Sequence, residues 1–259
     1  MKKSILLVAL LFLGIPCLRG QSPASNPYDL LSRVLTPIAS VFSPEAQQHA
    51  LSATLTLEEM TDLPPELAGQ RVELLLQPPD RMLIRGIYNG QMVTICRVGQ
   101  SVWIAPSVPP FDALTNPPGN PGKKKKGQST LDQMVLPFPP QQLVLLPVLL
   151  QVKDMGEEKS ARVLDVKLMQ ELAKGLGIED WSARLALNPD GKLARLGITG
   201  LQWKLGVRVE RLEFATELPA ATWQAPDGAI QLTPRQVHQW LDEWGRQMEP
   251  QPQTPKVAK

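Results

Sequence analysis

The sequence is poor in the residue types on which catalysis and covalent cross-linking most often depend. It contains two histidines and two cysteines among 259 residues. A hydrolytic enzyme needs a nucleophile with a base, or a metal with several ligands, and His49 and His238 are too few for either. No H-E-x-x-H, G-x-S-x-G or C-x-x-C motif and no glycine-rich phosphate loop occurs. We therefore expect no enzyme, no catalytic residue, no cofactor and no metal site.

Apolar runs long enough to span a membrane are also missing. The first run, Ile5 to Ile15, covers about 11 residues, whereas a helix needs about 20 to cross a bilayer. Two lysines precede this run and small residues follow it, which predicts a secretory signal peptide over residues 1–20. Lipid attachment at Cys17 is not expected, because Pro16 stands where that attachment requires a small residue. We therefore expect a soluble periplasmic protein.

A concentrated positive charge is absent as well. The net charge of +2 falls to −1 without residues 1–20, which hold three basic residues and no acidic one. Nucleic-acid binding depends on a strongly basic surface, so no nucleic-acid partner is expected. Lys123 to Lys126 form the main basic run, inside a proline- and glycine-rich loop expected over residues 106–130. A solvated loop is the more common role of such a run, and contact with anionic lipid is the alternative.

Without the leader only Cys96 remains, so no internal disulfide can form and the fold must depend on its core. The clearest structural pattern is a hairpin within RMLIRGIYNGQMVTICRVGQSVWIA, residues 81–105. Asn89-Gly90 favours a two-residue type I′ turn, which fixes the register of both strands. One face then pairs Met82 with Arg97, Ile84 with Ile95, Gly86 with Val93 and Tyr88 with Gln91. The other face pairs Arg81 with Val98, Leu83 with Cys96, Arg85 with Thr94 and Ile87 with Met92.

Both faces of this hairpin are largely apolar, whereas a sheet with one side in water shows a polar row on that side. Two explanations are open. Either the hairpin has a core on one side and helices on the other, or it belongs to a curved sheet whose hollow side holds an apolar guest.

Further elements follow from caps, turns and periodicity. Short helices are expected from Asn26-Pro27 and from Ser43-Pro44, the second ending near Leu51. Strands are expected over residues 51–57, 71–77, 101–105, 161–169, 181–187, 192–198 and 202–218, and a helical turn over 170–175. The apolar stretch Gln141 to Val152 is expected to be a short helix kinked at Pro147, or a lid.

Two elements near the C-terminus are more sharply specified. In the last long strand the apolar phase changes between Val209 and Leu212, which predicts a bulge near Glu210. Thr233-Pro234-Arg235-Gln236 forms a capping box, and an apolar stripe follows it at helical spacing. The stripe consists of Val237, Trp240, Leu241, Trp244 and Met248. The pattern indicates a single domain over residues 26–248 and a disordered tail over 249–259.

The strand and turn order resembles the bacterial outer-membrane lipoprotein carriers, the LolA/LolB-like superfamily. The matching segments are QPPDRMLIRGIYNGQMVTICRVGQSVWIAP and ARLALNPDGKLARLGI, the latter followed by VRVERLEFATELPAATWQAP. The resemblance implies an α+β fold with a mainly antiparallel, strongly curved and unclosed β-barrel. Helices would cover or plug its concave face, and an apolar cavity there would receive acyl chains in the periplasm. The C-terminal amphipathic helix would be an addition.

We therefore expect a carrier or binding protein for a lipid or lipoprotein acyl chain. The candidate wall and lid residues are Met82, Ile84, Tyr88, Val93, Ile95, Trp103, Leu145, Leu146 and Leu149. Ordinary core packing is the alternative explanation for each of them. A non-enzymatic envelope adaptor, which binds another protein through a sheet edge or the last helix, is the rival function. Either protein would be a monomer with at most peripheral membrane contact.

Overall fold

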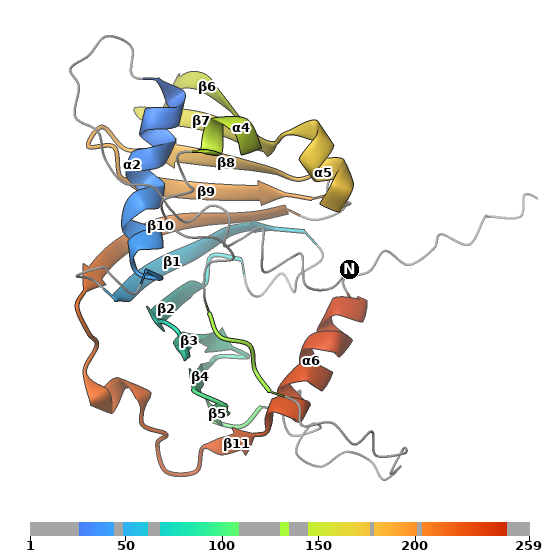
Figure 1. Cartoon of the computed structure of the whole chain (residues 1–259). Helices are drawn as coiled ribbons and strands as arrows, with labels where there is room; N and C mark the ends of the chain where they lie inside the picture. Colours follow the sequence, from blue (N-terminus) through green and yellow to red (C-terminus); the bar gives the residue numbers. More distant parts are fainter. Residues whose placement is uncertain are drawn as a thin grey trace, which may run out of the picture.

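The computed structural model describes residues 26–43, 49–61, 68–108, 130–134, 145–176, 179–200 and 204–247. The fold is α+β, with one antiparallel sheet of eleven strands that does not close (Figure 1). The strand order is β11-β5-β4-β3-β2-β1-β10-β9-β8-β7-β6. This confirms the predicted fold class of an open, mainly antiparallel half-barrel with helices against it.

The strands are β1 Ala50–Met60, β2 Arg71–Gln77, β3 Arg81–Tyr88, β4 Gln91–Val98, β5 Ser101–Ala105, β6 Leu150–Glu158, β7 Ala161–Leu168, β8 Ser182–Leu187, β9 Leu193–Thr199, β10 Lys204–Ala215 and β11 Ile230–Leu232. The helices are α2 Pro27–Ser40, α4 Leu146–Leu149, α5 Gln170–Leu176 and α6 Pro234–Gln247, with a 3-10 turn η3 at Ala220–Trp223.

The hairpin of β3 and β4 has the predicted register. Tyr88 pairs with Gln91 and Ile84 with Ile95, and the other predicted pairs are also present. Asn89 and Gly90 have φ of 49° and 76°, the left-handed values that a type I′ turn requires. A local turn signal therefore fixes which side chains face each side of the sheet.

The predicted bulge in β10 is also present. Thr54 pairs with Arg211 and Leu55 with Val209, so Glu210 is the extra residue. A second bulge, in β1, follows Leu57, because the next pair joins Glu59 to Gly206. Two bulges in neighbouring strands bend the sheet at its middle, since a bulge increases the local twist.

Helix α2 fills one half of the curved sheet. Its N-cap is Asn26, whose Oδ1 accepts a hydrogen bond from Tyr28 N at 3.1 Å. Tyr28 Oη donates to the carbonyl oxygen of Leu150 at 3.1 Å, which ties the helix to β6. Its buried stripe packs on β6 to β9 in a group of residues that we call the upper cluster. Its members are Leu30, Leu31, Val34, Leu35, Leu146, Leu150, Leu164, Val166, Ala183, Leu185 and Leu187.

Some predicted elements differ from the structure. The second N-terminal helix does not reach Leu51, which lies in β1; residues 44–48 are outside the described part. In the stretch Gln141 to Val152 the described helix is the single turn α4, and β6 begins at Leu150. Pro147 stands in the first turn of α4, where proline is tolerated and causes no kink. The residues that follow α4 pair with β7, so a strand replaces the expected second half of the helix.

Other predictions lie outside the described residues. These are the signal peptide over 1–20, the tail over 249–259, and almost all of the loop expected over 106–130. Within the described part of the chain, no helix is long and apolar enough to cross a membrane.

Candidate functional site

The face of the sheet that carries α2 and α6 is its concave face (Figure 1). On β3 the side chains of Met82, Ile84 and Tyr88 point to this face. Ile84 pairs with Ile95, which packs toward α6, and alternation along the strand puts Met82 and Tyr88 on the same side as Ile84. Val93 and Ile95 of β4 lie on the same face. Five of the predicted wall residues are thus brought together as one apolar surface.

We call the middle of this surface the central wall. It consists of Leu74 and Leu76 on β2, Met82 and Ile84 on β3, and Ile95 on β4. Leu74 and Leu76 pack against the end of α2, and Ile95 packs toward α6. Met82 and Ile84 lie between these two groups, and both are half-buried.

The two faces of β3 differ in how completely they are buried. Leu83 points to the convex face and has 0% of its surface exposed. Met82 and Ile84 flank Leu83 in the sequence and point to the concave face, where they keep part of their apolar surface accessible. At this point of β3 the convex side chain is therefore fully packed, whereas its two concave neighbours are incompletely covered.

Helix α6 covers the end of the concave face next to β11. Thr233 N donates to Gln236 Oε1 at 2.8 Å and Gln236 N donates to Thr233 Oγ1 at 3.4 Å, which confirms the predicted capping box. Val237 and Trp240 pack on a group of residues that we call the lower cluster. Its buried members are Val93, Val102, Ile104, Val108, Leu131 and Leu232. The Trp240 side chain thus packs on the sheet, as the apolar stripe predicts.

A short extended segment, Thr130–Met134, lies across the concave face, and we call it the strap. Leu131 N donates to Gln100 Oε1 at 2.7 Å, and Gln100 Nε2 donates to Leu131 O at 3.0 Å. Arg97 Nη2 donates to Asp132 O at 2.6 Å. Met134 N donates to the carbonyl oxygen of Pro79 at 2.7 Å. Side chains of the β4–β5 turn region therefore hold the strap, whose Leu131 enters the lower cluster.

Trp103 lies on the opposite face from the wall that it was predicted to join. It pairs with Cys96 in β4, and both side chains are buried on the convex side with Leu83. Trp103 Nε1 donates to the carbonyl oxygen of Trp223 at 3.2 Å. The segment around η3 thus covers the convex side of the hairpin, which explains why both of its faces are apolar.

The three leucines predicted as a lid are separated from the central wall. Leu146 is buried in the upper cluster and Leu149 packs against it, so both belong to the core under α2. Leu145 is 47% exposed. None of the three faces the hairpin, because α4 leads into β6 at the far edge of the sheet.

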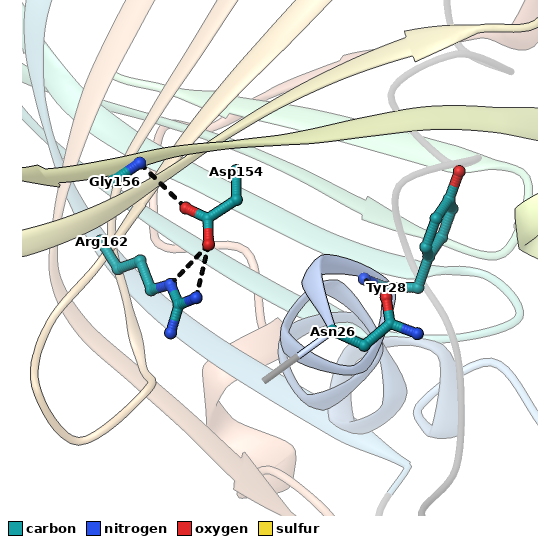
Figure 2. A network of polar contacts seen from close by, with 5 residues as sticks. All are labelled: Asn26, Tyr28, Asp154, Gly156 and Arg162. Atoms are coloured by element: carbon teal, nitrogen blue, oxygen red, sulfur yellow. Dashed lines mark hydrogen bonds and ion pairs between the residues drawn. The ribbon is translucent and has the colours of Figure 1, made fainter. Parts of the chain in front are cut away.

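Charged groups lie at the margins of the concave face. Figure 2 shows Asp154 accepting hydrogen bonds from Arg162 and from the backbone N–H of Gly156. The Arg162 hydrogen bond, and then the Gly156 one, lower the pKa of Asp154. The same hydrogen bond raises the pKa of Arg162. At the other margin, burial lowers the pKa of the Arg97 guanidinium. The negative charges of Asp80 and Asp132 act in the opposite direction and raise the pKa, by less than burial lowers it.

The chemistry available at the central wall is that of an apolar surface. Burial raises the pKa of the Cys96 thiol to about 11, so this group stays protonated at neutral pH. The described residues contain no group of three or more side chains suited to hold a metal ion. What the wall can do is contact hydrocarbon.

Sequence reasoning missed Leu74 and Leu76 as part of the wall. The run Leu74-Leu75-Leu76 gives no alternation, so the sequence does not indicate which of these leucines face inward. Pairing with Ile84 and Met82 assigns Leu74 and Leu76 to the concave face.

No protein-family model matches the chain, and no curated protein does. Among solved structures, the MucA/MucB complex of Pseudomonas aeruginosa is 14% identical, with 80% of this chain and 63% of that chain covered and a TM-score of 0.39. The lipoprotein LppX of Mycobacterium tuberculosis is 13% identical, with 66% and 89% covered and a TM-score of 0.35. A LolA superfamily protein of Nitrosomonas europaea is 10% identical, with 72% and 94% covered and a TM-score of 0.29.

The chain thus spans less than two thirds of the MucB-complex chain that it matches. At such TM-scores the likenesses say nothing about the site, so the function is inferred from this chain's own residues.

Proposed function

We propose that the protein binds the acyl chain of a lipid or lipoprotein on the central wall and does not convert it chemically. The observation that supports this is the contrast on β3 between fully buried Leu83 and half-buried Met82 and Ile84. Aliphatic surface left accessible inside a curved sheet gains about 25 cal/mol per Å² when hydrocarbon covers it. Aliphatic walls with few polar groups are typical of sites for apolar ligands.

The location of the wall adds to the proposal. Helix α2 occupies the upper half of the concave face with a tightly buried stripe, and Tyr28 ties it to β6. The other half is covered by α6 and by the strap, which is hydrogen-bonded to Gln100, Arg97 and Pro79. An acyl chain would therefore bind between these two coverings, next to Met82 and Ile84. The signal-peptide pattern of residues 1–20 supports a role in the periplasm.

The test compares two aspartate substitutions in one strand. Ile84 faces the central wall, whereas Ile87 faces the convex side and is 37% exposed. We expect Ile84→Asp to abolish binding of a fluorescent fatty acid and Ile87→Asp to retain it, because a carboxylate on the wall is not compatible with a bound hydrocarbon. Melting temperatures of both variants establish that they fold.

Two outcomes contradict the proposal. The first is equal fatty-acid binding by Ile84→Asp and Ile87→Asp. The second is unfolding of Ile84→Asp together with no fatty-acid binding by the unaltered protein, which identifies the site as packed core. If Ile84→Asp alone fails to fold, Ile84→Ala serves in its place and is expected to weaken binding while the protein stays folded.

A further inference from the structure

A glycine interrupts the apolar row that β3 presents to the concave face. Side chains alternate along a strand, so Gly86 shares that face with Ile84 and Tyr88, between which it stands. Gly86 pairs with Val93 of β4, a buried member of the lower cluster. The concave surface therefore lacks a side chain at a position directly next to the central wall.

The backbone and the packing of the fold do not require a glycine at this position. Gly86 does not have the positive φ that the glycines of the turns have. A Cβ added to Gly86 would lie 3.6 Å from Val72 Cγ2 and 3.8 Å from the carbonyl oxygen of Arg71, which are ordinary van der Waals distances. Because glycine also has more conformational freedom to lose on folding than alanine, stability gives no reason for it here.

The other glycines of the described strands differ from Gly86 in one respect or another. Gly156 has a φ of 84° at the bulge of β6. A Cβ on Gly206 would lie only 3.1 Å from Glu59 Cβ, so the fold requires this glycine. Gly197 has room for a Cβ, but it pairs with Gly206 on the convex face. Gly86 alone among these four combines room for a side chain with a place on the concave face.

The space above Gly86 is not filled by the described side chains. Val72 Cγ2 and the Arg71 carbonyl oxygen are the only described atoms within 4 Å of the added Cβ, apart from those of the two chain neighbours. A ring stacked on the glycine would lie within that distance, so neither Tyr88 nor Trp240 of α6 covers it. Gly86 is half-buried. Beside Ile84 the floor of the concave face is therefore the β3 backbone itself.

We propose that a bound acyl chain extends from Ile84 over Gly86 and packs directly on the β3 backbone there. This inference rests on the proposed function and adds a contact at the end of the wall away from the strap. The strap is held by Arg97, which pairs with Met82 at the other end of the same row. A glycine inside a strand is typical of places where a ligand closely approaches the backbone. A side chain at position 86 would lift the hydrocarbon off the sheet and weaken its binding, while the fold stays intact.

The test adds methyl groups at Gly86 and measures binding of a fluorescent fatty acid. We expect Gly86→Ala to weaken binding about fivefold, because the new methyl group occupies space that the acyl chain needs. Gly86→Val fills more of this space and should weaken binding further. Gly197→Ala is the matched control on the convex face, and it should bind the fatty acid as the unaltered protein does. Neither alanine variant should have a lower urea midpoint than the unaltered protein.

Three results overturn this inference. Equal fatty-acid binding by Gly86→Ala and the unaltered protein would mean that the acyl chain does not lie over Gly86, and the proposed function itself would stand. A lower urea midpoint for Gly86→Ala than for Gly197→Ala would mean that the fold requires the glycine. Absence of fatty-acid binding by the unaltered protein would remove the proposed function, and this inference with it.

Discussion

Replacing Gln100 by alanine should loosen the strap at Leu131 without unfolding the sheet. The Gln100 side chain accepts from Leu131 N at 2.7 Å and donates to Leu131 O at 3.0 Å, and Leu131 is 8% exposed. Each hydrogen bond contributes about 1 kcal/mol net, so the loss is about 2 kcal/mol, close to the 1.5–3 kcal/mol that burial of the Leu131 side chain contributes. The hydrogen bonds of Arg97 to Leu131 O and Asp132 O, and of Met134 N to Pro79 O, remain, so we expect local opening at Leu131 and not release of the whole strap.

Hydrogen exchange of the Leu131 amide is the direct assay. We expect its protection to fall roughly 30-fold in Gln100→Ala, which corresponds to about 2 kcal/mol, while amides in β3 keep theirs. Gln91→Ala is the control, since Gln91 is exposed at the hairpin turn. Unchanged protection of Leu131 in Gln100→Ala, or an equal loss in both variants, would refute the assignment of Gln100 as the anchor of the strap.

Two further predictions concern the bent middle of the sheet and its charged margin. Gly206→Ala should lower the free energy of unfolding in urea by about 1–2 kcal/mol, because the new Cβ would lie 3.1 Å from Glu59 Cβ. Gly197→Ala is the control, since a Cβ at that position has room, and it should leave the free energy of unfolding unchanged. Equal losses in the two variants would contradict this packing. Asp154→Asn should lower the free energy of unfolding at neutral pH by about 1 kcal/mol. This figure is small because the Asp154–Arg162 ion pair is partly exposed to water, which weakens it. Because Arg162 lowers the pKa of Asp154, this stabilisation is present above the ordinary aspartate pKa and is lost as pH falls through the lowered value. Urea unfolding of both proteins from neutral to acidic pH should therefore show a shrinking difference, and a constant difference would argue against the pair.

Features governed by neighbouring residues could be predicted from the sequence. Asn89-Gly90 determined the hairpin register, and Thr233 with Gln236 determined the start of α6. The change of apolar phase placed the bulge at Glu210, because side chains alternate strictly along a strand. In each case the determining residues lie within a few positions of the feature.

Features that depend on distant partners could not be predicted. The ring of Trp103 was assigned to the concave wall, but its partner Trp223 lies 120 residues away and covers the other face. Likewise β6 forms because β7 pairs with it, although the apolar run before it favours a helix. The candidate residues on β3 and β4 thus share one face of the sheet, as the hairpin register predicts, while Trp103 and the α4 leucines were assigned to that face without a local signal.

Photo-cross-linking locates a bound acyl chain most directly. A fatty acid that carries a diazirine on its chain is irradiated with the purified protein, and the labelled residues are identified by mass spectrometry. The account predicts labels on Met82, Ile84 and the facing residues of β2, all of them suppressed by excess unlabelled fatty acid. Labels confined to the convex side, or labels that excess fatty acid does not suppress, would contradict it.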